Sequence, residues 1–220
     1  MKIQMTLGHK TIALLLSALL AGPAIAADKP PATTPDGLEL VKNSKLDLAY
    51  RMPGVDLSGY RKIMLDPVEV AFKKQWTRDF NRVSSNDRER IRRDLAELAR
   101  RVFIEELEEK GGYAFVESPG PDVLRVTVAI VELYINAPDT MSTGRSRTYT
   151  VSTGQATLVA ELRDSESGAV LARAADRERG QESATMQWTT RADNLADARK
   201  ILSEWARTLR EVLDESRSKP

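Results

Sequence analysis

Hydrophobic and polar residues alternate along two long stretches, Arg61–Phe72 (RKIMLDPVEVAF) and Pro121–Ile135 (PDVLRVTVAIVELYI). Alternation with a period of two predicts a β-strand with one buried face. The alternation changes parity at Asp66-Pro67 in the first stretch and after Ile130 in the second. Because a parity change moves the side chains to the opposite face, each strand is expected to carry a bulge or kink there. The matching breaks predict that the two strands are neighbours in one twisted sheet.

Two further stretches repeat apolar residues at steps of three and four, which is typical of amphipathic helices. The first follows the N-cap candidates Ser84-Ser85-Asn86-Asp87 and ends at Gly111-Gly112. Its arginines alternate with acidic residues three and four positions away, so this face is predicted to be solvated and salt-bridged rather than to bind nucleic acid. The second helix follows Asp193-Asn194 and presents one apolar stripe up to Leu213.

Shorter alternating runs complete the sheet. Tyr113–Glu117, Gln155–Arg163 and Ala169–Ala175 are predicted strands, and the turn Asp164–Gly168 joins the last two. The stretch Leu38–Tyr60 is expected to lie across the domain with little regular structure. The order β-α-β-β-β-β-α predicts an α+β fold, in which a single antiparallel-dominated sheet of about five strands carries two amphipathic helices on one face.

Residues 1–26 have the pattern of a secretory signal peptide. Two lysines precede an apolar run, Ile12–Leu20, that is too short to span a membrane, and Ala24-Ile25-Ala26 fits a cleavage site. Cleavage after Ala26 predicts a periplasmic protein. Its parts are a flexible, proline-rich leader (residues 27–37), a single α+β domain (38–215) and a frayed tail (216–220).

Removal of the signal peptide changes the chemistry that the chain can offer. The only histidine, His9, lies in this segment, and the sequence contains no cysteine. The mature chain therefore lacks the usual ligands of zinc, haem and copper, and also the nucleophile systems built on His or Cys. We expect no cofactor and no metal site. Two of the 33 basic residues lie in the signal peptide, against 32 acidic residues in all, and so balanced a chain is not predicted to bind nucleic acid.

The stretches PGVDLSGYRKIMLDPVEVAF, GPDVLRVTVAIVELYI, TLVAELRDSESGAVLARAADR and the closing MQW…WA…LR resemble a bacterial envelope family catalogued as domain of unknown function 3313. The resemblance covers Leu38 to Leu213 and implies an exported protein. Many members are lipoproteins, whereas this sequence lacks the cysteine after the apolar run, so no lipid anchor is expected. The family has no established activity, and the resemblance implies no catalytic residue.

Four acidic residues surround the predicted strand breaks. Asp66 and Glu69 flank the break in the first strand, and Glu132 and Glu161 lie on neighbouring strands. Two carboxylates about 5–10 Å apart, one of raised pKa, can hydrolyse a glycosidic bond, which makes Asp66 and Glu69 catalytic candidates. The alternative is structural: Asp66 caps the backbone beside it, and the glutamates face water opposite arginines of adjacent strands.

Trp76 lies in a basic stretch, Lys73–Arg82 (KKQWTRDFNR), that is predicted to be a loop. Aromatic rings interleaved with basic side chains can bind anionic material such as lipid headgroups or cell-wall polymer. Alternatively, the ring packs over the edge of the sheet while the charges stay solvated.

The long polar loop 136–154 is a second candidate binding surface. Arg145, Arg147 and Tyr149 could contact a partner, or the segment RTYTV could add an edge strand to one. The alternative is an overlong hairpin without a binding role. Trp188, just before the last helix, is either a packing plug or a binding platform.

Export, the missing His and Cys and the long polar loop together predict a non-enzymatic binding or accessory protein of the cell envelope. Its expected partner is an envelope protein or an anionic envelope component, with no nucleic acid and no transmembrane span; the oligomeric state is left open. One alternative is a carboxylate-dependent hydrolase acting on a cell-envelope polymer. Another is a small-ligand carrier, which requires a deep apolar pocket between the sheet and the helices, and the aromatic content of 5% disfavours it.

Overall fold

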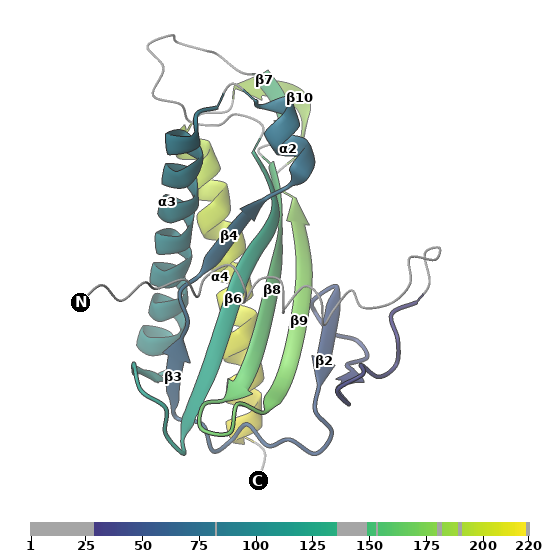
Figure 1. The fold of residues 1–220 in the computed structure, drawn as a ribbon, viewed down its shortest axis with the longest axis vertical. Coiled ribbons are helices and arrows are strands. Elements are labelled where there is room, and N and C mark those ends of the chain that lie inside the picture. Colours follow the sequence, from purple (N-terminus) through teal and green to yellow (C-terminus); the bar gives the residue numbers. More distant parts are fainter. Residues whose placement is uncertain are drawn as a thin grey trace, which may run out of the picture.

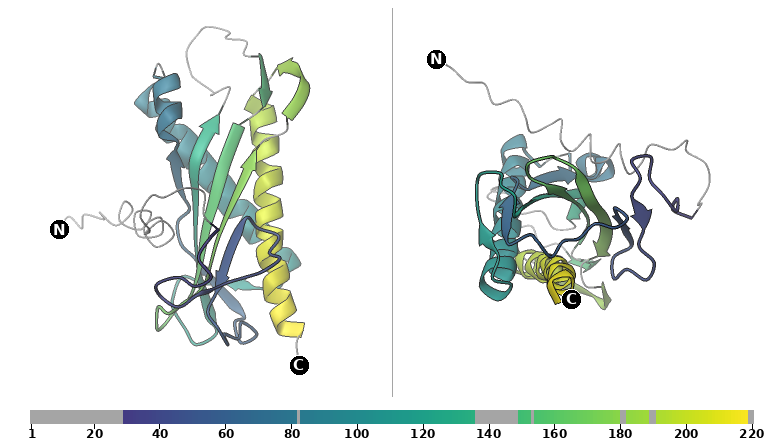
Figure 2. Two further views of the ribbon diagram at one scale, coloured as in Figure 1. Left: turned by 90° about the vertical axis from the view of Figure 1, so that its right-hand side faces the viewer. Right: turned by 90° about the horizontal axis from the view of Figure 1, so that it is seen from below.

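The computed structural model describes residues 29–81, 83–135, 149–152, 154–179, 182–188 and 191–218. The predicted signal peptide lies outside these residues. The fold is α+β, as predicted: a large twisted sheet carries the two long helices, α3 and α4, on one face (Figure 1). Seen from below, the two helices lie side by side along the curved sheet (Figure 2).

The centre of the sheet is β6 (Val123–Ile135), which pairs with two short strands on one side and with β8 on the other. The short strands are β3 (Lys62–Leu65) and β4 (Glu69–Phe72), and both run parallel to β6. The predicted neighbour relationship is therefore confirmed. The predicted single strand with a kink is instead two strands. The Asp66 N–H still donates to the Val126 carbonyl at 3.0 Å. After this bond the connecting segment, which contains Pro67, leaves the ladder, because proline has no N–H to donate.

The parity break in β6 is a bulge at Glu132. This residue has a φ of 53°, and the register with β8 shifts between Val131 and Tyr134. An extra residue in one strand reverses which side chains face the core. The alternation pattern therefore located this irregularity correctly.

The other half of the sheet is antiparallel. β8 (Gly154–Asp164) pairs with β6 and with β9 (Val170–Arg179), and both strands extend beyond their predicted bounds. The predicted turn between them is present: Asp164 accepts a hydrogen bond from the Ser167 N–H at 2.8 Å, and Gly168 adopts a φ of 71°.

The main sheet has eight strands within the described residues, not about five. Two of the three additional strands, β1 (Glu39–Leu40) and β2 (Leu48–Arg51), lie where little regular structure was expected, and the third arises because the first predicted strand is divided into β3 and β4. β5 (Ala114–Phe115) falls within a predicted strand. β2 becomes a strand because it pairs with β9 across more than a hundred residues of sequence, which no local pattern reveals. A separate two-stranded ribbon joins β7 (Tyr149–Ser152) to β10 (Glu182–Trp188).

The helices match their predicted signals closely. α3 (Ser85–Ile104) begins after Ser84, whose side chain accepts a hydrogen bond from the Asp87 N–H at 3.0 Å. It continues as a π-helical turn, η1 (Glu105–Lys110), and stops at the predicted glycine pair. α2 (Lys74–Asp79) is a short helix in the stretch that was predicted to be a loop.

α4 (Arg191–Ser218) is longer than predicted at both ends. Its last turn includes residues assigned to a frayed tail, because Ser216 is buried and its hydroxyl donates to the Val212 carbonyl at 3.0 Å. In the described residues, no helix combines the length and the hydropathy that a membrane span requires.

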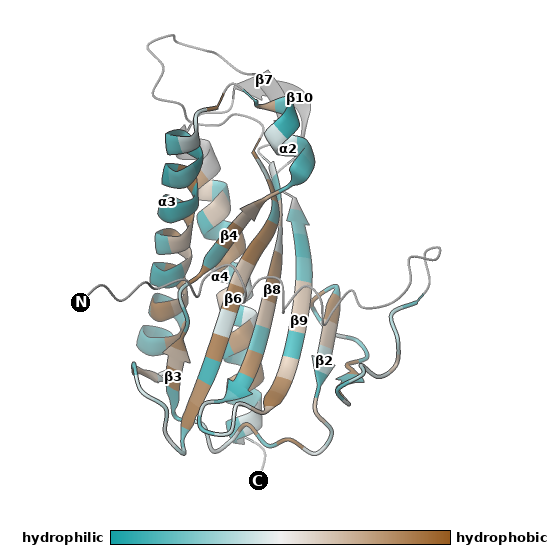
Figure 3. Cartoon of the chain, viewed as in Figure 1, coloured by the Kyte–Doolittle hydropathy of each residue, from teal (hydrophilic) through white to brown (hydrophobic). Residues whose placement is uncertain are grey.

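The core lies between the sheet and the two long helices. The core-facing positions of β6 and β8 pack against the apolar stripes of α3 and α4, and Figure 3 shows hydrophobic residues concentrated on β4 and the upper half of β6. Residues 31–38 also contact the domain rather than standing apart from it. Tyr50 donates a hydrogen bond to the Pro31 carbonyl at 2.9 Å, and Leu38 is fully buried.

Candidate functional site

A groove opens between α3, α4 and the upper ends of β6 and β8. Its volume is about 340 Å³, which is within the range of about 300–1,000 Å³ that small-molecule sites occupy. Its walls are mainly apolar, and the principal side chains are Leu95, Leu98, Ile130, Leu133, Ile201 and Trp205. We call this space the groove.

Two small residues from different elements line the groove. Ala156 lies on β8 and Ala198 on α4, and both line the space. The neighbouring core positions Leu158 and Leu202 carry larger side chains and are buried. Because the backbones of a helix and a sheet are held apart by their larger side chains, a pair of alanines between them leaves room unfilled.

Trp205 forms part of the floor of the groove and is almost completely buried. Its indole N–H donates to Oδ2 of Asp176 on β9 at 2.8 Å, while Oδ1 of the same carboxylate accepts from the Asp47 N–H at 2.8 Å. Two donors on one buried carboxylate fix its position, and Trp205 is held against the sheet as a result.

Charged residues surround the mouth of the groove. Arg90, Asp94, Glu97 and Arg101 come from α3, and Asp197 comes from α4. Arg90 lies 3.8 Å from Asp94. The groove therefore combines apolar walls with three acidic and two basic side chains, an arrangement that can hold an apolar molecule and contact a polar end of it.

The catalytic candidates lie outside the groove. Both carboxylate oxygens of Asp66 accept from Nε of Arg125 at 3.0 Å, and Oδ2 also accepts from the Thr127 hydroxyl at 2.6 Å. Neither Asp66 nor Glu69 lines the groove. Asp66 thus fastens the segment between β3 and β4 to β6 through side-chain contacts rather than by capping the local backbone.

Glu161 does not face water, which corrects the structural alternative for this residue. Its side chain is 4% exposed, and Oε2 accepts from Nε of Arg173 at 2.6 Å across the β8–β9 pair. Arg163, on the same strand, donates to the other oxygen. The fourth member of this cluster, Asp36, pairs with Arg173. Burial acts to raise the pKa of Asp36, but hydrogen bonds from Thr34 and Arg173 outweigh it and hold the pKa below its usual value.

Trp76 is fully buried in α2. Its ring stacks on Phe72 with a centroid distance of 4.1 Å and lies 5.5 Å from Phe80, and its N–H donates to the Ile135 carbonyl at 2.8 Å. Trp76 is therefore packed against neighbouring aromatic rings, as the second of the two interpretations expected. Binding of an envelope component through Trp76 stays a prediction.

The structure brings two other candidates together. Trp188 and Tyr149 are directly opposite in the register of the β10–β7 ribbon. The described residues of RTYTV, 149–151, lie in β7, which pairs with this chain's own β10. Arg145 and Arg147 lie outside the described residues, so their predicted role is untested.

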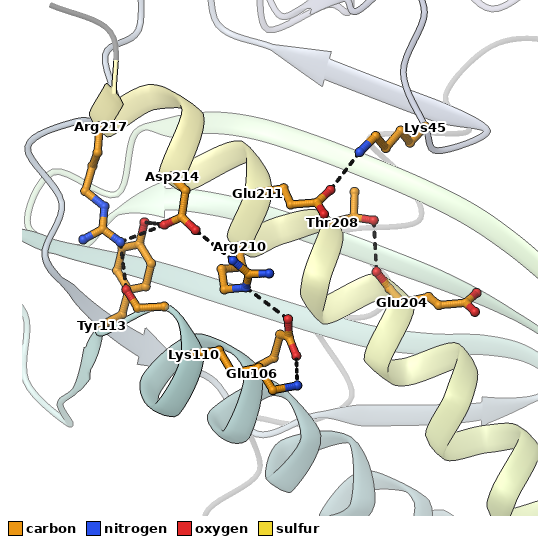
Figure 4. Close-up of polar contacts among 11 residues, drawn as sticks. Lys45, Glu106, Lys110, Tyr113, Glu204, Thr208, Arg210, Glu211, Asp214 and Arg217 are labelled. Atoms are coloured by element: carbon orange, nitrogen blue, oxygen red, sulfur yellow. Dashed lines mark hydrogen bonds and ion pairs between the residues drawn. The ribbon is translucent and has the colours of Figure 1, made fainter.

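A second polar cluster joins the lower ends of α3 and α4 (Figure 4). Glu106, in η1, is buried and accepts from Lys110 at 2.6 Å and from Nε of Arg210 at 3.0 Å. Arg210 also bonds Asp214, which accepts from Arg217 at 2.9 Å. Burial acts to raise the pKa of Glu106, but its two cationic partners outweigh burial and hold the pKa below the usual value. Each carboxylate has cationic partners, so the cluster is an ionic clamp between the helices.

No metal centre is evident in the part of the chain that the structure describes, where His, Cys, Asp and Glu side chains nowhere gather in threes. The sequence analysis stated that a carrier requires an apolar pocket between the sheet and the helices, but it did not identify the residues that line the groove. Alanine recurs in the apolar patterns of both elements, as at Ala160, so the sequence gives no signal that singles out Ala156 and Ala198.

Comparison with known proteins identifies a family but no activity. The model of a family described as "Protein of unknown function (DUF3313)" matches residues 35–209, which confirms the resemblance seen in the sequence. A search of curated proteins finds no match.

Three solved structures have a partly similar fold. A PelC dodecamer from Paraburkholderia phytofirmans has 14% sequence identity and a TM-score of 0.36, with 74% of this chain and 96% of that chain covered. Protein XCC0632 from Xanthomonas campestris has 12% identity and a TM-score of 0.38, with 75% and 93% covered. A putative neuraminyllactose-binding hemagglutinin homolog from Helicobacter pylori has 13% identity and a TM-score of 0.30, with 74% and 90% covered. These TM-scores are too low to carry an argument about function.

Proposed function

Because the chain belongs to DUF3313, a family of proteins of unknown function, we propose a function from its own geometry: it is a binding protein of the cell envelope that holds a small apolar ligand in the groove. The observation that carries this proposal is the apolar groove of about 340 Å³ between the helices and the sheet. It is the feature that a small-ligand carrier requires.

The dimensions of the groove favour a small molecule over a protein segment. An α-helix with its side chains is about 10–12 Å across, and the groove is too small to admit one. Its floor consists of core residues such as Ile130 and Leu202, which are at most 2% exposed. An occupant therefore has to be slender to reach them.

The hydrolase alternative gains no such support. Asp66 is engaged by Arg125 and Thr127, and neither Asp66 nor Glu69 lines the groove. Export to the periplasm, inferred from residues 1–26, is part of the proposal, since it would bring the groove into contact with envelope components.

The proposal is tested by filling the groove. Ala156→Leu and Ala198→Leu each place a larger side chain in the cavity, and we expect at least about tenfold weaker binding of the apolar dye N-phenylnaphthylamine, because the added atoms occupy the space the dye needs. Dye fluorescence during titration of the purified chain measures the affinity. Ala160→Leu is the matched control, because Ala160 lies on the same strand and packs against the same core but does not line the groove.

All three variants are first compared with the wild type by circular dichroism and thermal melting, which separates blocked binding from lost folding. If folded Ala156→Leu and Ala198→Leu bind the dye as tightly as the wild type and Ala160→Leu, the groove is not the binding site and the proposal is wrong.

A further inference from the structure

Positive charge is concentrated in one region of the chain. Ten basic and five acidic residues lie between Lys73 and Arg101, whereas the rest of the chain after Ala26 contains 21 basic and 27 acidic residues. The basic region forms α2 and most of α3, and Figure 1 places α2 and the first turns of α3 at the same end of the molecule, away from the C-terminus. A nearly neutral protein therefore has one region with a clear excess of positive charge.

The excess lies on one side of α3. The side that lines the groove carries two acidic and two basic residues, Arg90, Asp94, Glu97 and Arg101. On the other side, the Arg92 guanidinium lies 5.2 Å from the centroid of the Phe72 ring. Nη1 of Arg100 donates to the Leu65 carbonyl at 3.4 Å. These two contacts place the second side of α3 next to β3 and β4, near the start of α2.

We call the surface formed by α2, the residue before it and this side of α3 the basic face. Within the described residues it carries seven basic and two acidic side chains: Lys73, Lys74, Arg78, Arg88, Arg92, Arg93 and Arg100, with Asp79 and Glu89. Arg92 pairs with Glu89 at 3.1 Å, and Arg93 pairs with Asp94 at 3.3 Å. No carboxylate of the described residues forms an ion pair with the other five basic side chains, so most of the positive charge is uncompensated.

The basic face lacks the apolar residues on which protein partners usually depend. Trp76 is fully buried beneath it, and the exposed large hydrophobic residues of the described chain, Val41, Leu195 and Val212, lie elsewhere. Protein–protein interfaces are centred on aromatic or aliphatic residues that become buried on binding. A lipid surface needs no such residue, because anionic headgroups attract each lysine and arginine that comes near them.

We infer that the basic face docks on the surface of a bilayer that contains anionic phospholipids. The exposed side chains of Lys74 and Arg78 would contact the headgroups without first having to leave a carboxylate partner. This inference goes beyond the proposed function and does not depend on it, since the groove lies on the other side of α3.

Docking is tested by co-sedimentation with vesicles. The mature chain, residues 27–220, is used because it contains every described residue and lacks the apolar run Ile12–Leu20, which would bind lipid by itself. At about 50 mM salt we expect vesicles of phosphatidylglycerol and phosphatidylcholine in equal parts to bind at least about tenfold more tightly than vesicles of phosphatidylcholine alone. Equal binding to the two kinds of vesicle overturns the inference, as does binding that is unchanged at about 300 mM salt, where exposed charges are screened.

Charge-neutralising variants locate the binding surface. Lys74→Gln with Arg78→Gln removes two charges from α2, and Arg88→Gln with Arg93→Gln removes two from α3. One charge near an anionic surface changes the affinity about fivefold, so each pair should weaken binding to the anionic vesicles at least about tenfold. Affinity equal to that of the wild type in either double variant contradicts the inference.

The matched control is Lys200→Gln with Arg207→Gln. Both residues are exposed on α4, outside the basic face, and the double variant has the same net charge as each of the other two. Its affinity for the anionic vesicles should stay within about twofold of the wild type. An equal loss in the control would mean that overall charge, rather than this face, governs binding.

An acidic protein is the other class of partner that a basic surface can bind, and soluble polyglutamate represents it. If the mature chain binds polyglutamate but not the anionic vesicles at the same salt concentration, the inference is wrong. Circular dichroism and thermal melting show that every variant is folded. The face variants should bind N-phenylnaphthylamine as the wild type does, so the docking inference and the groove proposal fail in different measurements.

Discussion

The indole N–H of Trp205 donates to Oδ2 of Asp176 at 2.8 Å, and this bond ties α4 to β9 at the floor of the groove. Both side chains are buried. Because the same carboxylate also accepts from the Asp47 backbone at 2.8 Å, one residue links the helix layer, the sheet and the segment before β2. The floor of the groove is therefore set by contacts between parts of the chain that are distant in sequence.

Asp176→Asn should lower the free energy of unfolding by about 1–3 kcal/mol. The carboxylate accepts from two N–H groups, and the asparagine side chain would present its own NH₂ group to one of them, which leaves that donor without an acceptor. Urea denaturation measures the loss. Trp205→Phe removes the partner N–H, so Asp176→Asn should cost less in that background than in the wild type. Equal costs in the two backgrounds would mean that the Trp205–Asp176 bond contributes nothing.

The raised pKa values of two tyrosines predict that the folded protein loses stability at alkaline pH. Burial raises the pKa of Tyr60 to about 12, and the hydrogen bond to Asp164 acts in the same direction. Burial also raises the pKa of Tyr113 to about 12; Asp214 adds to this rise, and Arg217 opposes it. The folded pKa lies above the unfolded value of about 10, so this stability is fully present below pH 10 and is lost as the pH rises toward 12.

For Tyr113 the contribution amounts to at most about 2 kcal/mol. Tyr113→Phe and Tyr60→Phe should each make the decline in unfolding free energy between neutral and alkaline pH shallower than in the wild type. Denaturant titrations at several pH values measure it, and phenolate absorbance reports the ionisation. A decline as steep in both variants as in the wild type would show that neither tyrosine is coupled to unfolding.

Asp66→Asn distinguishes the structural role of this residue from a catalytic one. The substitution weakens the contacts with Arg125 and Thr127, so we expect the free energy of unfolding to fall by about 1 kcal/mol and the melting temperature to fall with it. Asp122→Asn, which affects the more exposed pair with Lys62, is the control and should change stability less. An unchanged melting temperature together with loss of a wall-polymer hydrolysis present in the wild type would instead support the hydrolase.

The sequence by itself located the elements whose causes are local. The parity changes at Asp66-Pro67 and in β6 marked real interruptions of the ladder, because the side-chain period of a strand is set by its own backbone. Ser84 and the glycine pair marked the ends of the α3–η1 helix for the same kind of reason, since caps act within a few residues. The missing His and Cys were likewise readable without a structure.

Only the tertiary structure decided which residues became neighbours. Glu161 became a buried ion-pair partner of Arg173, and β2 became a strand, through contacts made across the sheet. Ala156 and Ala198 both line the groove, one from a strand and one from a helix that are far apart in the chain. Periodicity fixes which face a side chain takes, but the space left between two faces depends on how they pack together, and that is determined only when the whole chain has folded.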